Sequence, residues 1–427
     1  MAQLTRLIIR GVNVAVVATS LLGSAPLRAS DAVNAKPLQL AALALPSAAR
    51  ADWQQWDAFL TFAVKRLAQE LRPAQRDQMA EVFLDSRYQL TQLVGSGASD
   101  PVPSLFLNSW ERVSPILKQS LTGLSPQTAS QFTGFIGSMD TLKNLASVGG
   151  QFGLFRLTPE ALRGAARFLG TANVDPLAYT LEIDGALRSL LGFAESLPAA
   201  RPSSAIEQSR LQRLREKAAA RLRVLSPRSA HAAIEDEFER LNEWVPDSRE
   251  LQEYLLMVQK LFSETSDRVL AKSALADEHQ KLYRQTVLAT GWQESCWRQF
   301  VKKGDKLTPL ASSTGDVGLM QVNRTTWRSL YDVKGLAGDI SYNGYAGAEI
   351  LHQYLTRYVI RKKEDKQPGG HLARATYSAY NAGPGGLARY RGVRQSATWK
   401  KVDDAFWDKF KAVSAGQELA VKSCYGA

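Results

Sequence analysis

The stretch LADEHQKLYRQTVLATGWQES, residues 275–295, decides the fold of the C-terminal third, because it predicts one helix that ends near Glu294. Tyr283, Val287, Thr290 and Glu294 recur at steps of four, three and four residues, which places them on one helix face. Because that face is mostly apolar, we expect the Glu294 carboxylate to point toward the packed side. Burial raises the pKa of a carboxyl group, as a general acid near neutral pH requires. Periodicity alone leaves an exposed glutamate at the helix end as the alternative.

Two further segments place polar side chains beside turn-forming residues. The first, TPLASSTGDVGLMQVNRTTW at residues 308–327, is a loop that runs through the tetrapeptide GLMQ at residues 318–321. Glycine lets the backbone approach a ligand closely, and the Gln321 amide is both donor and acceptor. The second, AYNAG at residues 379–383, ends a predicted helix, which its glycine and the following proline stop. Each segment taken alone is also explained as an ordinary loop or helix cap.

Taken in order, the Glu294-Ser295 pair, GLMQ and AYNAG resemble the three signature motifs of the soluble lytic transglycosylase (SLT) domain, over roughly residues 265–395. The resemblance implies a lysozyme-like, goose-type, mainly α-helical fold with a glycan groove. It implies cleavage of the β-1,4 bond between N-acetylmuramic acid and N-acetylglucosamine of peptidoglycan without water, leaving 1,6-anhydro ends. It also implies Glu294 as the catalytic acid and then base, and as substrate-binding residues Ser295, Met320, Gln321, Tyr380 and Asn381.

One carboxylate is enough for this chemistry. Glu294 would protonate the leaving oxygen, the substrate's N-acetyl oxygen would stabilise C1, and Glu294 would then remove a proton from the 6-hydroxyl group. Most glycosidases use two carboxylates, and the nearest candidates for a second are Asp305 and Asp316, which we expect to be solvated loop residues. Two alternatives stay open: a hydrolytic muramidase on the same fold, and a wall-binding or assembly protein with a glycan-anchoring domain.

The region before this domain is predicted to be helical throughout. Trp53, Trp56 and Leu60 begin a stripe with helical spacing, and a small polar residue before proline marks helix starts at Ser125, Thr158 and Ser226. These residues carry no motif that indicates a function. The sequence therefore predicts an all-helical domain of unknown role at residues 51–262 and a catalytic domain at residues 263–427.

The N-terminal 50 residues have the composition of a targeting segment. Arg6 and Arg10 precede an apolar run from Gly11 to Leu22, and small residues follow, as in a secretory signal peptide. The apolar run is shorter than the roughly 18 to 20 residues that span a bilayer, so we expect no stable transmembrane anchor. We predict a signal peptide at residues 1–32 and a linker at residues 33–50, which implies a periplasmic protein, either soluble or wall-associated.

The formal net charge of +12 among 427 residues predicts attraction to a polyanion. Export and the lack of aromatic residues interleaved with basic ones argue against nucleic acid, so the predicted partners are peptidoglycan strands and a wall-associated protein bound by the helical domain. The four histidines lack the spacing of a zinc site, and we expect neither a metal nor a cofactor. Cys296 and Cys424 are either a disulfide or two buried thiols, since sequence does not give their separation.

Overall fold

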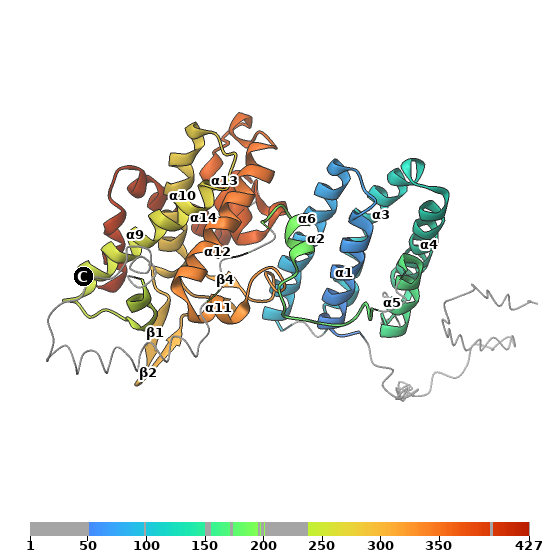
Figure 1. The fold of residues 1–427 in the computed structure, drawn as a ribbon, viewed down its shortest axis with the longest axis horizontal. Helices are drawn as coiled ribbons and strands as arrows, with labels where there is room; N and C mark the ends of the chain where they lie inside the picture. Colours follow the sequence, from blue (N-terminus) through green and yellow to red (C-terminus); the bar gives the residue numbers. More distant parts are fainter. Residues whose placement is uncertain are drawn as a thin grey trace, which may run out of the picture. The chain divides into compact units, whose positions relative to one another are not determined.

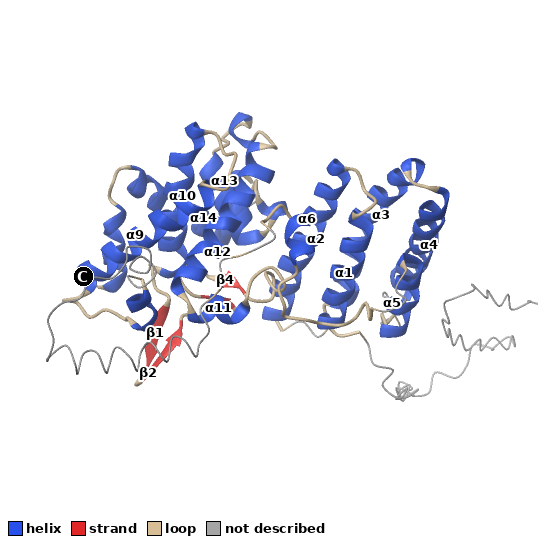
Figure 2. Cartoon of the chain, in the orientation of Figure 1, coloured by secondary structure: helices blue, strands red, loops and turns tan. Residues whose placement is uncertain are grey.

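The protein is described here by a computed structural model that covers residues 51–97, 100–149, 155–170, 174–194, 197, 200, 238–392 and 396–426. These residues are mainly helical, as the sequence predicted (Figure 2). They fall into two compact units, one within Met1–Glu70 and Val102–Tyr179 and the other within Leu71–Pro101 and Thr180–Ala427. The predicted signal peptide and linker, and the helix start predicted at Ser226, lie outside the described residues.

The first unit consists of packed helices with an apolar interior (Figure 1). Its elements are α1 (Trp53–Ala68), α3 (Val102–Ser120), α4 (Pro126–Gly149), α5 (Pro159–Ala166) and the short turns Leu121–Gly123 and Arg167–Leu169. Helix α1 begins where the Asp52 side chain accepts a hydrogen bond from the Gln55 backbone N–H, and α5 begins where Thr158 caps and Pro159 follows. The rings of Trp56 and Phe106 meet edge to face, so aromatic contacts join α1 to α3.

The second unit contains most of the remaining helices. They are α2 (Pro73–Gly95), α6 (Gly185–Leu190), α9 (Leu251–Leu270), α10 (Asp277–Ser295), α11 (Val333–Gly338), α12 (Ile340–Gln353), α13 (Leu372–Ala382) and α14 (Ala397–Ser414). Shorter helical turns lie at Glu239–Glu243, Tyr354–Ile360, Glu364–Lys366, Pro384–Gly386, Arg389–Arg391 and Glu418–Tyr425. Helix α10 is the centre of this unit, because α9, α12, α13 and α14 all pack against it (Figure 1). Gly291 permits the contact with α9, since a Cβ there would lie 2.4 Å from the Phe262 ring.

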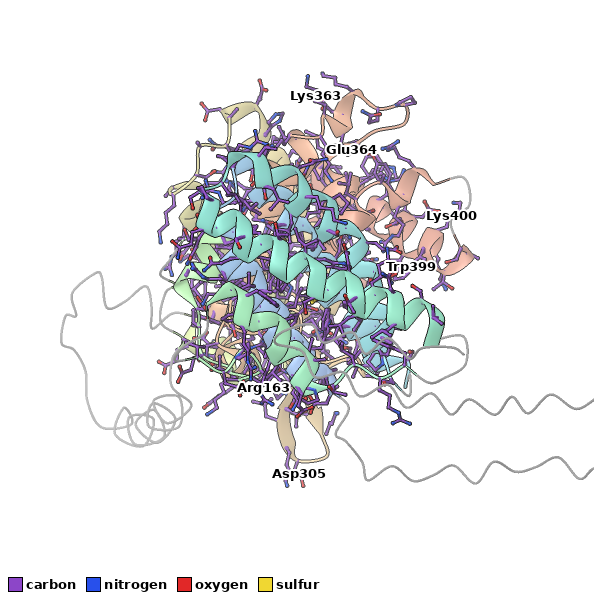
Figure 3. The ribbon with its side chains drawn as sticks, turned by 90° about the vertical axis from the view of Figure 1, so that its right-hand side faces the viewer. Arg163, Asp305, Lys363, Glu364, Trp399 and Lys400 are labelled. Carbon is purple, nitrogen blue, oxygen red and sulfur yellow. A yellow bond between two sulfur atoms is a disulfide. The ribbon has the colours of Figure 1, made fainter. Side chains whose placement is uncertain are left out.

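Two short antiparallel strand pairs, which the sequence did not predict, follow α10. Strand β1 (Phe300–Lys303) pairs with β2 (Lys306–Pro309), and β3 (Asp316–Val317) pairs with β4 (Val322–Asn323). Asp305 lies in the turn between β1 and β2, at the exposed tip of that hairpin (Figure 3). Such two-residue and four-residue strands carry too few alternating positions for a sequence pattern to reveal them.

Helix α2 belongs to the second unit because its polar side chains are built into that unit's interior. The Arg87 guanidinium donates to the backbone oxygens of Thr326, at 3.2 Å, and Arg328, at 2.6 Å. The Tyr88 hydroxyl donates to the Tyr380 backbone oxygen at 2.8 Å, and Asp85 accepts from the Gly385 backbone N–H at 2.8 Å. The second unit therefore takes in both α2, which packs against the turn at Pro384–Gly386, and α9, which packs against α10.

Helix α6 places a buried cation in the second unit. Arg188 is completely buried and donates to both carboxylate oxygens of Glu349, at 2.9 and 3.1 Å. The Tyr331 hydroxyl donates to the same carboxylate at 2.7 Å. A buried ion pair of this kind is held only by such additional hydrogen bonds, so it fixes α6 against α12 in one arrangement. No helix among the described residues has the length and apolar character needed to cross a membrane.

Candidate active site

Glu294 lies in the last turn of α10 and borders a pocket of the second unit. We call this pocket the acid pocket; it is lined by Tyr88, Thr91, Gln92, Glu294, Thr314, Asp316, Gln321, Val322, Asn323, Thr326, Trp327, Tyr380, Asn381 and Trp399. Tyr283, Val287 and Thr290, which share the predicted stripe with Glu294, are all completely buried. The Glu294 Oε1 atom is itself buried and has no hydrogen-bond partner among the residues that the structure describes. The carboxylate thus points toward the packed side, as its spacing predicted.

The environment of Glu294 favours its protonated form. Burial raises the pKa of Glu294 to about 7, and the negative charge of Asp316 acts in the same direction. A hydrogen bond from Tyr377 and the positive charges of Arg389 and Lys409 oppose this increase in the pKa without cancelling it. A carboxyl group with this pKa is partly protonated at neutral pH and is able to donate and accept a proton in turn.

The helix ends just after Glu294 because the backbone turns into the left-handed region at Cys296, where φ is 53°. Cys296 forms a disulfide with Cys424, and the Tyr425 hydroxyl donates to the Cys296 backbone oxygen at 2.9 Å. The C-terminal residues therefore fasten the end of the helix that carries Glu294.

Ser295 and Met320 are buried and do not line the acid pocket. The Ser295 hydroxyl donates to the Leu319 backbone oxygen at 2.6 Å, which ties the end of α10 to the loop at residues 318–321. The Met320 backbone N–H donates to the Asn343 side chain at 2.8 Å, and the Met320 side chain lies against Gly347. Both residues stabilise the loop that presents the neighbouring Gln321.

Gln299 forms the other support of this loop. Its completely buried amide accepts a hydrogen bond from the Leu319 backbone N–H at 2.7 Å. Gly318 has a φ of 76°, and a Cβ at this position would lie 2.3 Å from the Gln299 Oε1 atom. Only glycine therefore allows the backbone to come this close to the buried amide.

Gln321, Tyr380 and Asn381 all line the acid pocket with Glu294. The Gln321 Nε2 donates to the Gly318 backbone oxygen at 2.8 Å, and the Tyr380 hydroxyl donates to the Met320 backbone oxygen at 2.6 Å. The Asn381 Oδ1 accepts from Arg389 at 2.8 Å. The structure thus brings together lining residues from all three sequence motifs, one from each of the first two and two from the third.

The two aspartates that the sequence singled out have different positions. Asp305 is exposed at the tip of the β1–β2 hairpin and does not line the acid pocket. The expectation that Asp316 is a solvated loop residue was wrong, because it is half-buried on β3 and lines the pocket. Its carboxylate accepts from the hydroxyls of Ser312 and Thr314, both at 2.5 Å, and from the Asn323 amide at 2.8 Å.

Several residues that line the acid pocket were not predicted from the sequence. Tyr88, Thr91 and Gln92 come from α2, about 200 residues before Glu294, and no local pattern links them to it. Trp399 is 36% exposed in the first turn of α14, and the Arg389 guanidinium lies 4.4 Å from its ring centre (Figure 3). The only available signal for Trp399 was an aromatic residue soon after the third motif. Among the described residues, no cluster of His, Cys, Asp and Glu side chains has the arrangement of a metal site.

Comparison with known families identifies the segment that carries this pocket's acid. Residues 273–402 match the family model described as Transglycosylase SLT domain. No curated protein and no solved structure matched the chain. The match spans α10 to the first residues of α14, including the three motifs and Trp399, and it leaves out α2. The C-terminal part of this mainly helical chain is therefore a transglycosylase SLT domain of the lysozyme-like superfamily, preceded by a helical region.

Proposed function

We propose that the chain is a peptidoglycan lytic transglycosylase, which cleaves the β-1,4 bond between N-acetylmuramic acid and N-acetylglucosamine and leaves 1,6-anhydro-N-acetylmuramic acid ends. The observation that carries the proposal is the state of Glu294. It is a carboxyl group with a buried, unpartnered oxygen among the described residues, its pKa is raised to about 7, and it borders a pocket that all three motifs line. A proton donor placed in this way is what cleavage of a glycosidic bond requires.

In the proposed mechanism, Glu294 begins protonated and gives its proton to the oxygen that leaves C1. The N-acetyl oxygen of the substrate stabilises the positive charge that develops at C1. The Glu294 carboxylate then takes the proton of the 6-hydroxyl group, whose oxygen bonds to C1 and closes the anhydro ring. The proton returns to Glu294, so the enzyme is regenerated without water.

Hydrolysis by a muramidase is the second candidate, and the position of Asp316 favours it. Asp316 lines the same pocket as Glu294, so a water molecule held by Asp316 would have access to C1. Against this, three hydrogen bonds from Ser312, Thr314 and Asn323 already occupy the Asp316 carboxylate. We regard Asp316 as a group that orients the loop and raises the pKa of Glu294.

Mass analysis of peptidoglycan digested by the full-length chain separates the two reactions. Lytic cleavage gives muramic acid ends that are lighter than hydrolytic ends by one water, and we expect only these. Asp316→Asn should retain the anhydro product, although its turnover decreases as the loop loosens. Reducing muramic acid ends as the sole product, lost in Asp316→Asn, would establish the muramidase instead.

A wall-binding or assembly protein is the remaining alternative. The variant Glu294→Gln distinguishes a catalytic SLT domain from one that only binds the wall, because it removes the acid and keeps the shape of the side chain. We expect this variant to bind purified peptidoglycan as the parent does and to release no soluble fragments. Fragment release by the parent chain that persists in the variant would exclude the proposed role of Glu294.

We also propose that the protein is exported to the periplasm and acts there on the wall. The composition of residues 1–32 supports export, and a disulfide between Cys296 and Cys424 fits an oxidising compartment. N-terminal sequencing of the protein from a periplasmic extract should give a start near Ala29 or Ala32. A full-length cytoplasmic protein would contradict export. A wall-associated protein partner of residues 51–262 stays a prediction.

A further inference from the structure

Helix α2 provides one wall of the acid pocket from outside the matched SLT segment. Tyr88, Thr91 and Gln92 line the pocket, and their spacing of three and four residues puts them on one face of the helix. Residues 273–402 contain all three motifs and do not contain this wall. Helix α2 therefore adds three side chains to the pocket that the SLT segment alone does not contain.

Two of these three side chains already have their hydrogen bonds within the protein. The Tyr88 hydroxyl donates to the Tyr380 backbone oxygen at 2.8 Å and accepts from the Tyr354 hydroxyl at 3.0 Å. The Thr91 hydroxyl lies 2.8 Å from the Thr326 hydroxyl and 3.1 Å from the Arg87 backbone oxygen. Both residues therefore shape the wall and have little capacity left for a ligand.

Gln92 differs from its two neighbours. Its side chain is exposed at the pocket and makes no hydrogen bond with any residue that the structure describes. A glutamine amide provides an acceptor at Oε1 and donors at Nε2, with no charge. This pairing is complementary to another amide, which presents one N–H and one carbonyl oxygen.

The helix that carries Gln92 is held in place along its length. Asp77 accepts hydrogen bonds from Arg357 and Arg361, and Lys362 donates to Glu81 at 2.9 Å. Closer to the pocket, the buried Arg87 bonds to backbone oxygens of the segment after β4. A side chain on such a fixed helix loses little entropy other than its own when it binds a ligand.

We propose that Gln92 is a specificity-determining residue that binds the acetamido group of an N-acetylated hexosamine in the acid pocket. This inference rests on the proposed function for the choice of a glycan, and it assigns the recognition of the acetyl group to a helix outside the SLT segment. Gln92 does not take part in proton transfer. Its contribution is therefore to binding, and it should appear in KM more than in kcat.

The test uses the full-length chain with Glu294→Gln, so that binding is measured without cleavage. The probes are a soluble β-1,4-linked oligomer of N-acetylglucosamine and the matching glucose oligomer, which has a hydroxyl in place of each acetamido group. Gln92→Leu removes the amide, and Gln78→Leu is the matched control, because Gln78 is exposed on α2 and does not line the pocket. Calorimetric titration gives the Kd of each protein variant for each oligomer.

We expect Gln92→Leu to weaken binding of the acetylated oligomer about fivefold, as the loss of one net hydrogen bond implies, and to leave the glucose oligomer unaffected. Gln78→Leu should change neither Kd, and both variants should melt at the parent temperature. The assignment would be overturned if Gln92→Leu and Gln78→Leu bound the acetylated oligomer equally well, or if Gln92→Leu lost the same affinity for both oligomers. Because no turnover is required, a parent chain that binds glycan without cleaving it would refute the proposed function and leave this inference standing.

Discussion

The interiors of the two compact units are built from different kinds of side chain. Helices α1, α3, α4 and α5 of the first unit bury aromatic and aliphatic residues such as Trp56 and Phe106. Asp57 is the one charged residue that is buried in the described part of that unit. The second unit buries several charged residues, and two of them, Arg87 and Arg188, bond to backbone carbonyl oxygens far away in the sequence.

This difference determines how precisely the side chains of each unit must be positioned. Apolar packing tolerates exchanges of similar volume, whereas buried charges need partners at fixed positions and angles. In the second unit, one of these partners lines the acid pocket, because Arg87 donates to the Thr326 backbone oxygen. We infer that the second unit is built to hold a site, while the first tolerates change.

The largest effect is expected at Glu294. Glu294→Gln should lower kcat on peptidoglycan by about a thousandfold or more, because it removes the buried carboxyl group that is proposed to donate the proton. Glu278→Gln, in the exposed first turn of the same helix, is the control and should be active. Release of soluble muropeptides gives the rates. A loss of less than tenfold would mean that Glu294 is not the proton donor.

The second-largest effect is expected for a buried ion pair, whose loss should cost more stability than the loss of an exposed pair. Glu349→Gln leaves Arg188 buried beside a neutral group and should lower the free energy of unfolding by about 3 to 5 kcal/mol. Glu111→Gln breaks the exposed pair with Lys143 in the first unit and should cost about 1 kcal/mol or less. Urea unfolding of the full-length variants measures both. Similar costs would mean that the buried charges do not distinguish the second unit.

The pH dependence tests the environment of Glu294. The acid must start protonated and its pKa is raised to about 7, so kcat/KM should decline about tenfold per unit of pH above 7. Since burial disfavours the charged form, the folded chain also loses stability as the pH rises from about 4.5 to about 7.

Glu294→Gln cannot ionise, so its melting temperature should exceed that of the parent above pH 7 and match it at pH 4. Thermal unfolding of both proteins across this pH range gives the comparison. An activity profile whose decline starts near pH 4.5, with parallel melting curves, would show that Glu294 is solvated.

The smallest effect is expected in the apolar interior. Phe106→Leu, at a completely buried position of α3, should lower stability by about 1 to 2 kcal/mol and leave kcat/KM within twofold. A matched exchange in the second unit, Phe262→Leu beneath Gly291, should reduce kcat/KM as well, because it loosens α10. Equal effects on activity would contradict the division of roles between the units.

Local patterns predicted much of this molecule. The helical stripe that aims Glu294 inward, the proline-led helix starts at Pro126 and Pro159, and the stop at Gly383 all depend on residues a few positions apart. The order of the motifs then identified the SLT domain. Long-range partners were not predictable, because residues such as Arg188 and Glu349, 161 positions apart, meet only after folding.

The acid pocket shows the same limit. Gln321, Tyr380 and Asn381 belong to motifs that the sequence reveals, whereas Gln92 belongs to a helix, α2, that carries no motif. Nothing in the spacing of α2 distinguishes a face that lines a pocket from one that faces solvent. Ser295 and Met320 illustrate the reverse case, since a residue within a motif can support the backbone without reaching the pocket.

The bond between Cys296 and Cys424 closes a covalent ring of the chain, with a sequence separation of 128 residues. Gln321 and Tyr380 lie inside this ring, and Glu294 lies two residues before it. A single proteolytic cut anywhere within the ring leaves every pocket-lining segment attached to α10. The cut protein would migrate as one species until a reductant separates the pieces, so a nicked chain keeps its catalytic parts together.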